Sequence, residues 1–132
     1  MHIYSDTALI FLKKVRAFSF DILKNEMGLP FQRKRLLFRG KHYPLDFVVF
    51  EHDKVLGEYD PHYFQIKINK QLIYKANDHH LKNIIRHEIA HYITHLIFGV
   101  NVLPHGKEFL SVCQRFNFSR EISNASVEAY KL

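Results

Sequence analysis

The chain has 132 residues, a length typical of one domain, and its 19 Lys and Arg against 13 Asp and Glu give a formal net charge of +6. Its single cysteine, Cys113, excludes an intrachain disulfide framework and any four-cysteine zinc site. No apolar run approaches a membrane span, and the apolar run from Ala8 to Leu12 is too short for a signal peptide, so we expect a cytoplasmic monomer, or a nuclear one in a eukaryote, that binds no membrane.

The N-terminal part predicts one helix followed by a small sheet. Ser5 or Asp6 can cap the helix, and Gly28 and Pro30 end it. Its expected buried face consists of Ala8, Phe11, Val15, Phe18 and Ile22. Strands are predicted at residues 35–38, 46–50, 55–59 and 63–69, with a turn at 40–44 and a linking segment at 72–76. Because the connections are short, we expect these strands to form an antiparallel sheet.

The C-terminal part predicts helices. The first is the longest, with Asp78 as its cap, Gly99 as its end and an apolar stripe of Leu81, Ile85, Ile89, Tyr92 and Leu96. A second carries Phe109, Val112, Cys113 and Phe116, and a short one is expected within residues 121–132. Helix, small sheet and further helices in this order are typical of a single α+β domain over residues 1–132.

The long helix carries the motif H-E-x-x-H at His87, Glu88 and His91. Residues four apart share one face of a helix, so both imidazoles can reach one metal ion, and Glu88 can take a proton from a water at the open metal position. Catalytic zinc usually has three protein ligands. The candidates for the third are His95, His105, Glu108 and Glu121. His105 is the best of them, since it follows a loop with Gly99 and Pro104 that can fold back toward the helix.

His87-Glu88-x-x-His91, followed by His105-Gly106 and Phe109, resembles the SprT-like zinc metalloproteases. The segments Leu56-Gly57-Glu58-Tyr59 and Ile66-Lys67-Ile68-Asn69 resemble the strand pair that precedes the zinc helix in that family. The resemblance covers residues 5–118 and implies a minimal zincin-like domain with His87, His91 and His105 on one Zn²⁺ and Glu88 as general base. It also implies protein or peptide substrates, including proteins crosslinked to DNA. The cysteine-rich zinc ribbon of larger relatives is missing, so their DNA binding does not carry over.

Two further features stay open at the level of sequence. An oxyanion donor could be Tyr59, His62 or His95, although each is more often an ordinary core or surface residue. The densest basic run, Arg33-Lys34-Arg35 with Arg39 and Lys41, is either a solvated turn or a DNA-contacting surface. The alternatives to a zinc endopeptidase are therefore a basic nucleic-acid-binding module with a structural or vestigial metal site, and a zinc hydrolase of non-peptide substrates.

Overall fold

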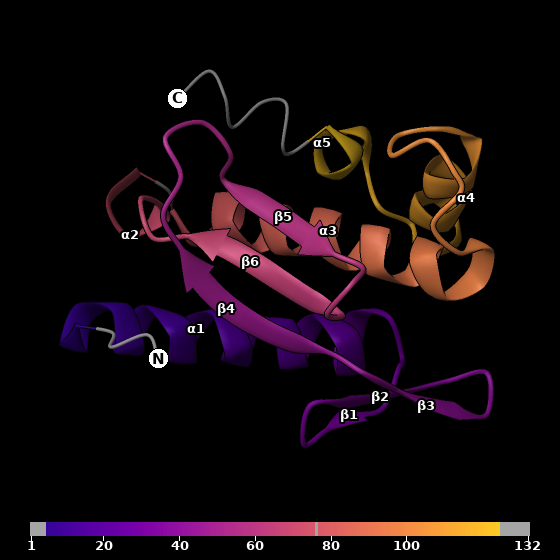
Figure 1. Ribbon diagram of the computed structural model, residues 1–132, viewed down its shortest axis with the longest axis horizontal. Coiled ribbons are helices and arrows are strands. Elements are labelled where there is room, and N and C mark those ends of the chain that lie inside the picture. The colour runs from indigo at the N-terminus through magenta and orange to yellow at the C-terminus, as the bar shows by residue number, and fades with distance from the viewer. Residues whose placement is uncertain (1–4, 76, 125–132) are drawn as a thin grey trace.

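The computed structural model describes residues 5–75 and 77–124 (Figure 1). An N-terminal helix continues into a π-helical turn, six strands form two small sheets, and four further helices follow. In chain order the elements are α1 (Asp6–Asp21), η1 (Ile22–Glu26), β1 (Phe31–Gln32), β2 (Arg35–Phe38), β3 (Lys41–Pro44), β4 (Asp46–Phe50), β5 (Gly57–Asp60), β6 (Gln65–Asn69), α2 (Leu72–Lys75), α3 (Asp78–Phe98), α4 (Lys107–Arg115) and α5 (Arg120–Ser123). The predicted α+β class is confirmed, while the part of the predicted tail helix beyond Asn124 lies outside the described residues.

The sheet next to α3 is mixed, which corrects the expectation of an antiparallel sheet. Its strand order is β4-β6-β5. β6 is antiparallel to β5 but parallel to β4, with Phe47 opposite Ile66 and Val49 opposite Ile68. After β4 the chain passes to the far edge to make β5 and then returns as the central strand. The short connections between β4, β5 and β6 are thus compatible with parallel pairing of β4 and β6. β5 lies at the edge of the sheet.

A second sheet, β1-β2-β3, consists of two hairpins that extend away from the main body of the fold (Figure 1). β3 is a strand where the sequence predicted a turn, because the reversal needs only Arg39 and Gly40. Both hairpin turns have two central residues at positive φ, which are 53° and 61° at Arg33 and Lys34 and 51° and 79° at Arg39 and Gly40. Such turns favour Asn or Gly, and each non-glycine residue held there costs roughly 1 kcal/mol.

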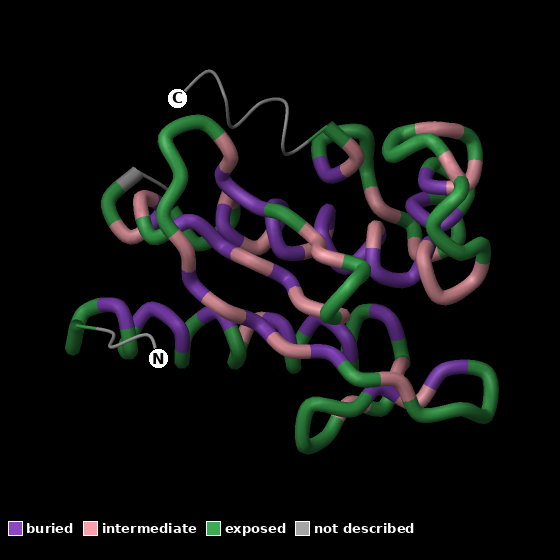
Figure 2. The backbone as a smooth tube through the Cα atoms, in the orientation of Figure 1, coloured by how far each residue is buried: buried purple, intermediate pink, exposed green. Residues whose placement is uncertain are grey.

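The core lies between the β4-β6-β5 sheet and the two long helices, α1 and α3. Alternate sheet residues, such as Phe47 and Ile66, are buried, and the buried side of α1 faces the same layer (Figure 2). Ser5 caps α1 as predicted, since its Oγ accepts a hydrogen bond from the Ala8 N–H at 3.2 Å. No helix in the described part of the chain is long and apolar enough to cross a membrane.

α3 positions the site and is buried along most of its length. Its N-cap is Asn77, whose Oδ1 accepts from the His80 N–H at 2.8 Å, and not Asp78 as the sequence suggested. Asn and Asp have similar N-cap propensities. Propensity therefore cannot tell whether Asn77 or Asp78 caps the helix, and the backbone conformation decides it. The helix ends at Gly99 as predicted, with a φ of 79° that lets the chain turn back toward His105.

Candidate metal centre

Three histidines converge near the middle of α3. His87 and His91 lie one turn apart on the helix, and His105 comes from the loop before α4. All three Nε2–Nε2 separations are 3.2 Å. Tetrahedral zinc with Zn–N bonds of about 2.0–2.1 Å places its ligand nitrogens roughly 3.3–3.4 Å apart. The cluster therefore has the dimensions of a three-histidine zinc site.

The backbone of α5 orients His87. The Nδ1 of this buried ring lies 2.8 Å from the Ile122 carbonyl oxygen. Because a carbonyl can only accept, Nδ1 carries the proton and donates it, which leaves the Nε2 lone pair directed at the cluster. Metal-binding histidines commonly donate their second ring nitrogen in this way.

The side chain of Phe109 in α4 packs against all three imidazoles. It is fully buried, stacks on His91 at 4.3 Å between ring centroids with an interplanar angle of 22°, and contacts His87 and His105 at 5.1 and 5.2 Å. One aromatic side chain thus restricts all three rings, so α4 contributes to the site although it carries none of the three histidines.

Burial keeps the two helical imidazoles neutral. Desolvation lowers the pKa of His87 to about 4, against a partial opposing effect of its Ile122 hydrogen bond, and lowers that of His91 to about 3. Desolvation also lowers the pKa of His105. Neutral imidazole is the form that binds metals, so the cluster can accept a cation at neutral pH without first releasing protons.

Glu88 lies against the edge strand, beside the cluster. It is only 2% exposed. A Cβ atom added to Gly57 of β5 would lie 3.1 Å from Glu88 Oε2 and 2.9 Å from Ile84 Cγ2, so this position has no room for a side chain. Gly57 therefore allows the β5 backbone to approach α3 closely enough to pack against the carboxylate.

A cleft of about 350 Å³ opens beside the histidines. It is lined by Glu88, His91 and His105, by residues 57–59 of β5 and by most of the loop of residues 99–105. Tyr59 and His95 also line it and are joined by a hydrogen bond of 2.7 Å between Tyr59 Oη and His95 Nδ1. The arrangement joins a metal-sized ligand set, a carboxylate and an edge strand in one open groove.

The sequence model of the SprT-like family matches residues 23–130. The chain belongs to this family. Protein SprT of Pseudomonas fluorescens strain SBW25 is 41% identical over 44 residues, which are 33% of this chain and 27% of that protein. Protein SprT of Vibrio atlanticus is 39% identical over 51 residues, or 39% of this chain and 30% of that protein. The matched segment thus spans less than a third of these relatives, and no solved structure matches the chain significantly.

Of the residues predicted for this SprT-like site, the structure brings His87, His91 and His105 together with Glu88 beside them. Two of the other ligand candidates have different partners, since His95 bonds Tyr59 and Glu121 Oε1 lies 3.2 Å from His79 Nε2. The third, Glu108, is not part of the metal-sized cluster among the described residues. His62 is exposed and does not line the cleft. Sequence reasoning missed the Ile122 carbonyl, which no side-chain pattern marks, and missed that Phe109 contacts all three rings.

Proposed function

We propose that this protein is a zinc-dependent endopeptidase. The observation that carries the proposal is the 3.2 Å triangle of His87, His91 and His105 nitrogens, since His91 and His105 line the same cleft as Glu88. A structural zinc site would have four protein ligands, whereas the one metal-sized cluster of His, Cys, Asp or Glu found among the described residues has three. This supports catalysis over a structural or vestigial site.

The cleft residues have distinct roles in the proposed reaction. A zinc ion held by the three histidines would polarise the scissile carbonyl and lower the pKa of the attacking water. Glu88 accepts the proton of that water as the new carbon–oxygen bond forms, and then donates it to the nitrogen of the leaving amine. β5 pairs only with β6 among the described strands, so its outer edge can bind an extended substrate through backbone hydrogen bonds.

The family and the cleft support a proposal for the substrate class. Backbone pairing along β5 tolerates many side chains, which suits an enzyme that acts on varied proteins. By likeness to the family we include DNA-associated and DNA-crosslinked proteins in the proposed substrates. Hydrolysis of a non-peptide substrate is the remaining alternative, and it is tested by the same variants with ester substrates.

The test is metal content and casein cleavage in wild type, Glu88→Gln and His105→Ala, with His62→Ala as a matched histidine control. We expect about one zinc per chain in wild type, Glu88→Gln and His62→Ala, and much weaker retention in His105→Ala. Cleavage should occur in wild type and His62→Ala and be lost in the other two. Wild-type protein that binds no zinc would exclude the proposal, as would a fully active Glu88→Gln.

A further inference from the structure

A second concave surface lies where the end of α4 meets η1 and the β2–β3 hairpin. It has a volume of about 430 Å³, and its lining residues come from segments 26–29, 38–39 and 115–117. This volume falls within the range of roughly 300–1,000 Å³ that is typical of ligand pockets. None of its lining residues lines the cleft beside Glu88, so the hollow is separate from the proposed catalytic site.

Four apolar side chains belong to the lining of this hollow. Met27 and Phe38 are buried, while Leu29 and Phe116 are partly buried and pack against the core. They come from η1 and its continuation, from β2 and from the residue after α4, so three separate parts of the chain build one apolar surface. Such a surface can remove an apolar side chain of a bound molecule from water.

Two arginines add positive charge to the same hollow. Arg39 lies in the turn after β2, and Arg115 is the last residue of α4. Both are exposed, and in the described part of the chain no carboxylate oxygen lies within 4 Å of either guanidinium. The guanidinium carbon of Arg39 lies 5.2 Å from the centre of the Phe38 ring, which keeps this cation beside the apolar lining. Both charges are therefore available to an external carboxylate.

The acidic residue of the lining, Glu26, does not cancel this charge. Its two carboxylate oxygens accept hydrogen bonds from Nε and Nη2 of Arg86, both at 2.8 Å. The Arg86 side chain is only 15% exposed, and such a bidentate pair is among the stronger ion pairs in proteins. Glu26 is thus neutralised within the fold, and the hollow keeps the positive charge of its two arginines.

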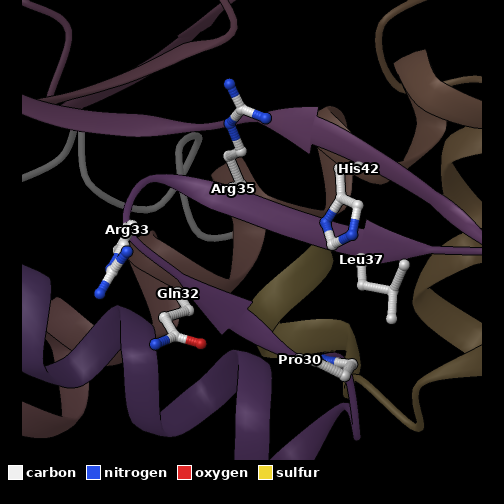
Figure 3. Close-up of a pocket in the computed structure, with 6 residues that line it drawn as sticks. All are labelled: Pro30, Gln32, Arg33, Arg35, Leu37 and His42. Carbon is white, nitrogen blue, oxygen red and sulfur yellow. The ribbon is translucent and has the colours of Figure 1, made fainter.

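The other face of β2 has a hollow with a different character. Its lining consists of Pro30, Gln32, Arg33, Arg35, Leu37 and His42 (Figure 3). Because side chains alternate along a strand, Arg35 and Leu37 point to this face, whereas the buried Leu36 and Phe38 point to the other. This lining also has two arginines, but it includes no Phe, Tyr or Trp and no buried residue. It serves as a control surface, with the same charge and without the apolar contact.

We propose that the hollow at the end of α4 binds an acidic peptide segment of another protein, with an apolar side chain of that segment as its anchor. The apolar side chain packs against Phe38 and Phe116, and a neighbouring carboxylate accepts hydrogen bonds from Arg39 or Arg115. Arginine suits this role because its planar guanidinium pairs with carboxylates in bidentate geometry. A nucleic-acid backbone is recognised by cations alone and has no apolar side chain for the lining, so the combination favours a peptide.

The test is fluorescence anisotropy with three labelled octapeptides, one of alternating Glu and Leu, one of Glu only and one of alternating Lys and Leu. The full chain is compared with Arg39→Gln/Arg115→Gln and with the control Arg33→Gln/Arg35→Gln, which removes the same charge from the face in Figure 3. Every protein carries Glu88→Gln, so that no peptide is cleaved. We expect the Glu/Leu peptide to bind most tightly. The Arg39/Arg115 variant should bind it about tenfold more weakly, and the control should change less than about twofold.

Binding is measured without cleavage, so its outcome and that of the protease proposal are independent. Thermal melting shows whether each variant keeps its fold, and Arg39→Gln alone, at an exposed turn residue, replaces the double variant if that variant melts early. Equal losses in the two double variants would overturn the assignment of the surface, since binding would then follow net charge alone. The assignment of the ligand would be overturned if the Glu/Leu peptide does not bind or binds no better than the Glu-only peptide. It would also be overturned if a labelled 20-base-pair duplex binds more tightly than the peptide and loses affinity in the Arg39/Arg115 variant alone.

Discussion

At the scale of single residues, Tyr59 is placed to stabilise the oxyanion of the proposed reaction. Its hydroxyl lines the cleft, and burial raises its pKa above the ordinary value, so it is a protonated donor at neutral pH. In the tautomer that carries the proton on His95 Nδ1, that N–H donates to the Tyr59 oxygen, and the Tyr59 O–H is left to donate into the cleft. We expect Tyr59→Phe to lower the kcat of peptide cleavage about 100-fold and to leave zinc content unchanged. Tyr63→Phe, at an exposed tyrosine, is the control, and equal kcat values for the two variants would rule out this role.

Gly57 controls the position of the carboxylate. In Gly57→Ala the new methyl group would lie 2.9 Å from the Cγ2 of Ile84, a buried β-branched side chain that cannot easily move. The strain should therefore displace Glu88, whose Oε2 would be only 3.1 Å away. We expect cleavage to fall about tenfold or more while zinc is retained, because the atoms nearest this position belong to Ile84 and Glu88 and not to a histidine. Zinc analysis and steady-state kinetics on the same sample check this, and wild-type kcat would contradict it.

At the scale of elements, α4 supports the metal centre through Phe109. Phe109→Leu keeps an apolar side chain in the buried position but removes the ring that stacks on His91 at 4.3 Å. We expect a loss of stability of less than about 2 kcal/mol, with zinc affinity reduced by roughly 10- to 100-fold because the imidazoles are less restricted. Competition with a chelator measures the affinity and urea unfolding the stability. Val112→Ala, a buried change on the same helix, is the control, and an equal effect on zinc would point to helix packing alone.

The elements also show how far sequence reasoning can go. The long helix with His87 and His91 was predictable because its apolar stripe and motif follow one helical period, and His105 followed from loop length and family likeness. The parallel pairing of β4 with β6 was not predictable, since it depends on which edge β5 occupies. β3 was missed because its residues are mostly exposed, with no alternation to reveal a strand. The Ile122 carbonyl is backbone, and only the docking of α5 brings it to His87.

At the scale of the whole molecule, the free energy of unfolding of the metal-free protein should decrease as the pH falls. The folded-state pKa values of about 4 for His87 and about 3 for His91 lie below the ordinary 6.5, so between these values the unfolded chain binds protons that the folded chain does not. Stability is therefore complete above pH 6.5 and falls as the pH drops toward 4. Urea midpoints of chelator-treated protein at pH 7.5, 6.0 and 5.0 should decrease in that order. If the urea midpoint decreases less with pH in His91→Gln than in wild type, the pH dependence arises from the histidine cluster. Wild-type midpoints that do not change between pH 7.5 and 5.0 would contradict the expectation.

The strand order β4-β6-β5 also bears on how the chain folds. β5 and β6 are joined by only four residues, 61–64, so their antiparallel pairing closes a small loop and can form within microseconds. β4 joins the opposite edge of β6 only after a longer excursion of the chain, which makes its pairing slower. Until β4 docks, β6 has a free edge and the apolar side chains of Ile66 and Ile68 lack part of their cover. The interval before β4 docks is the period in which association between chains would compete most with correct folding.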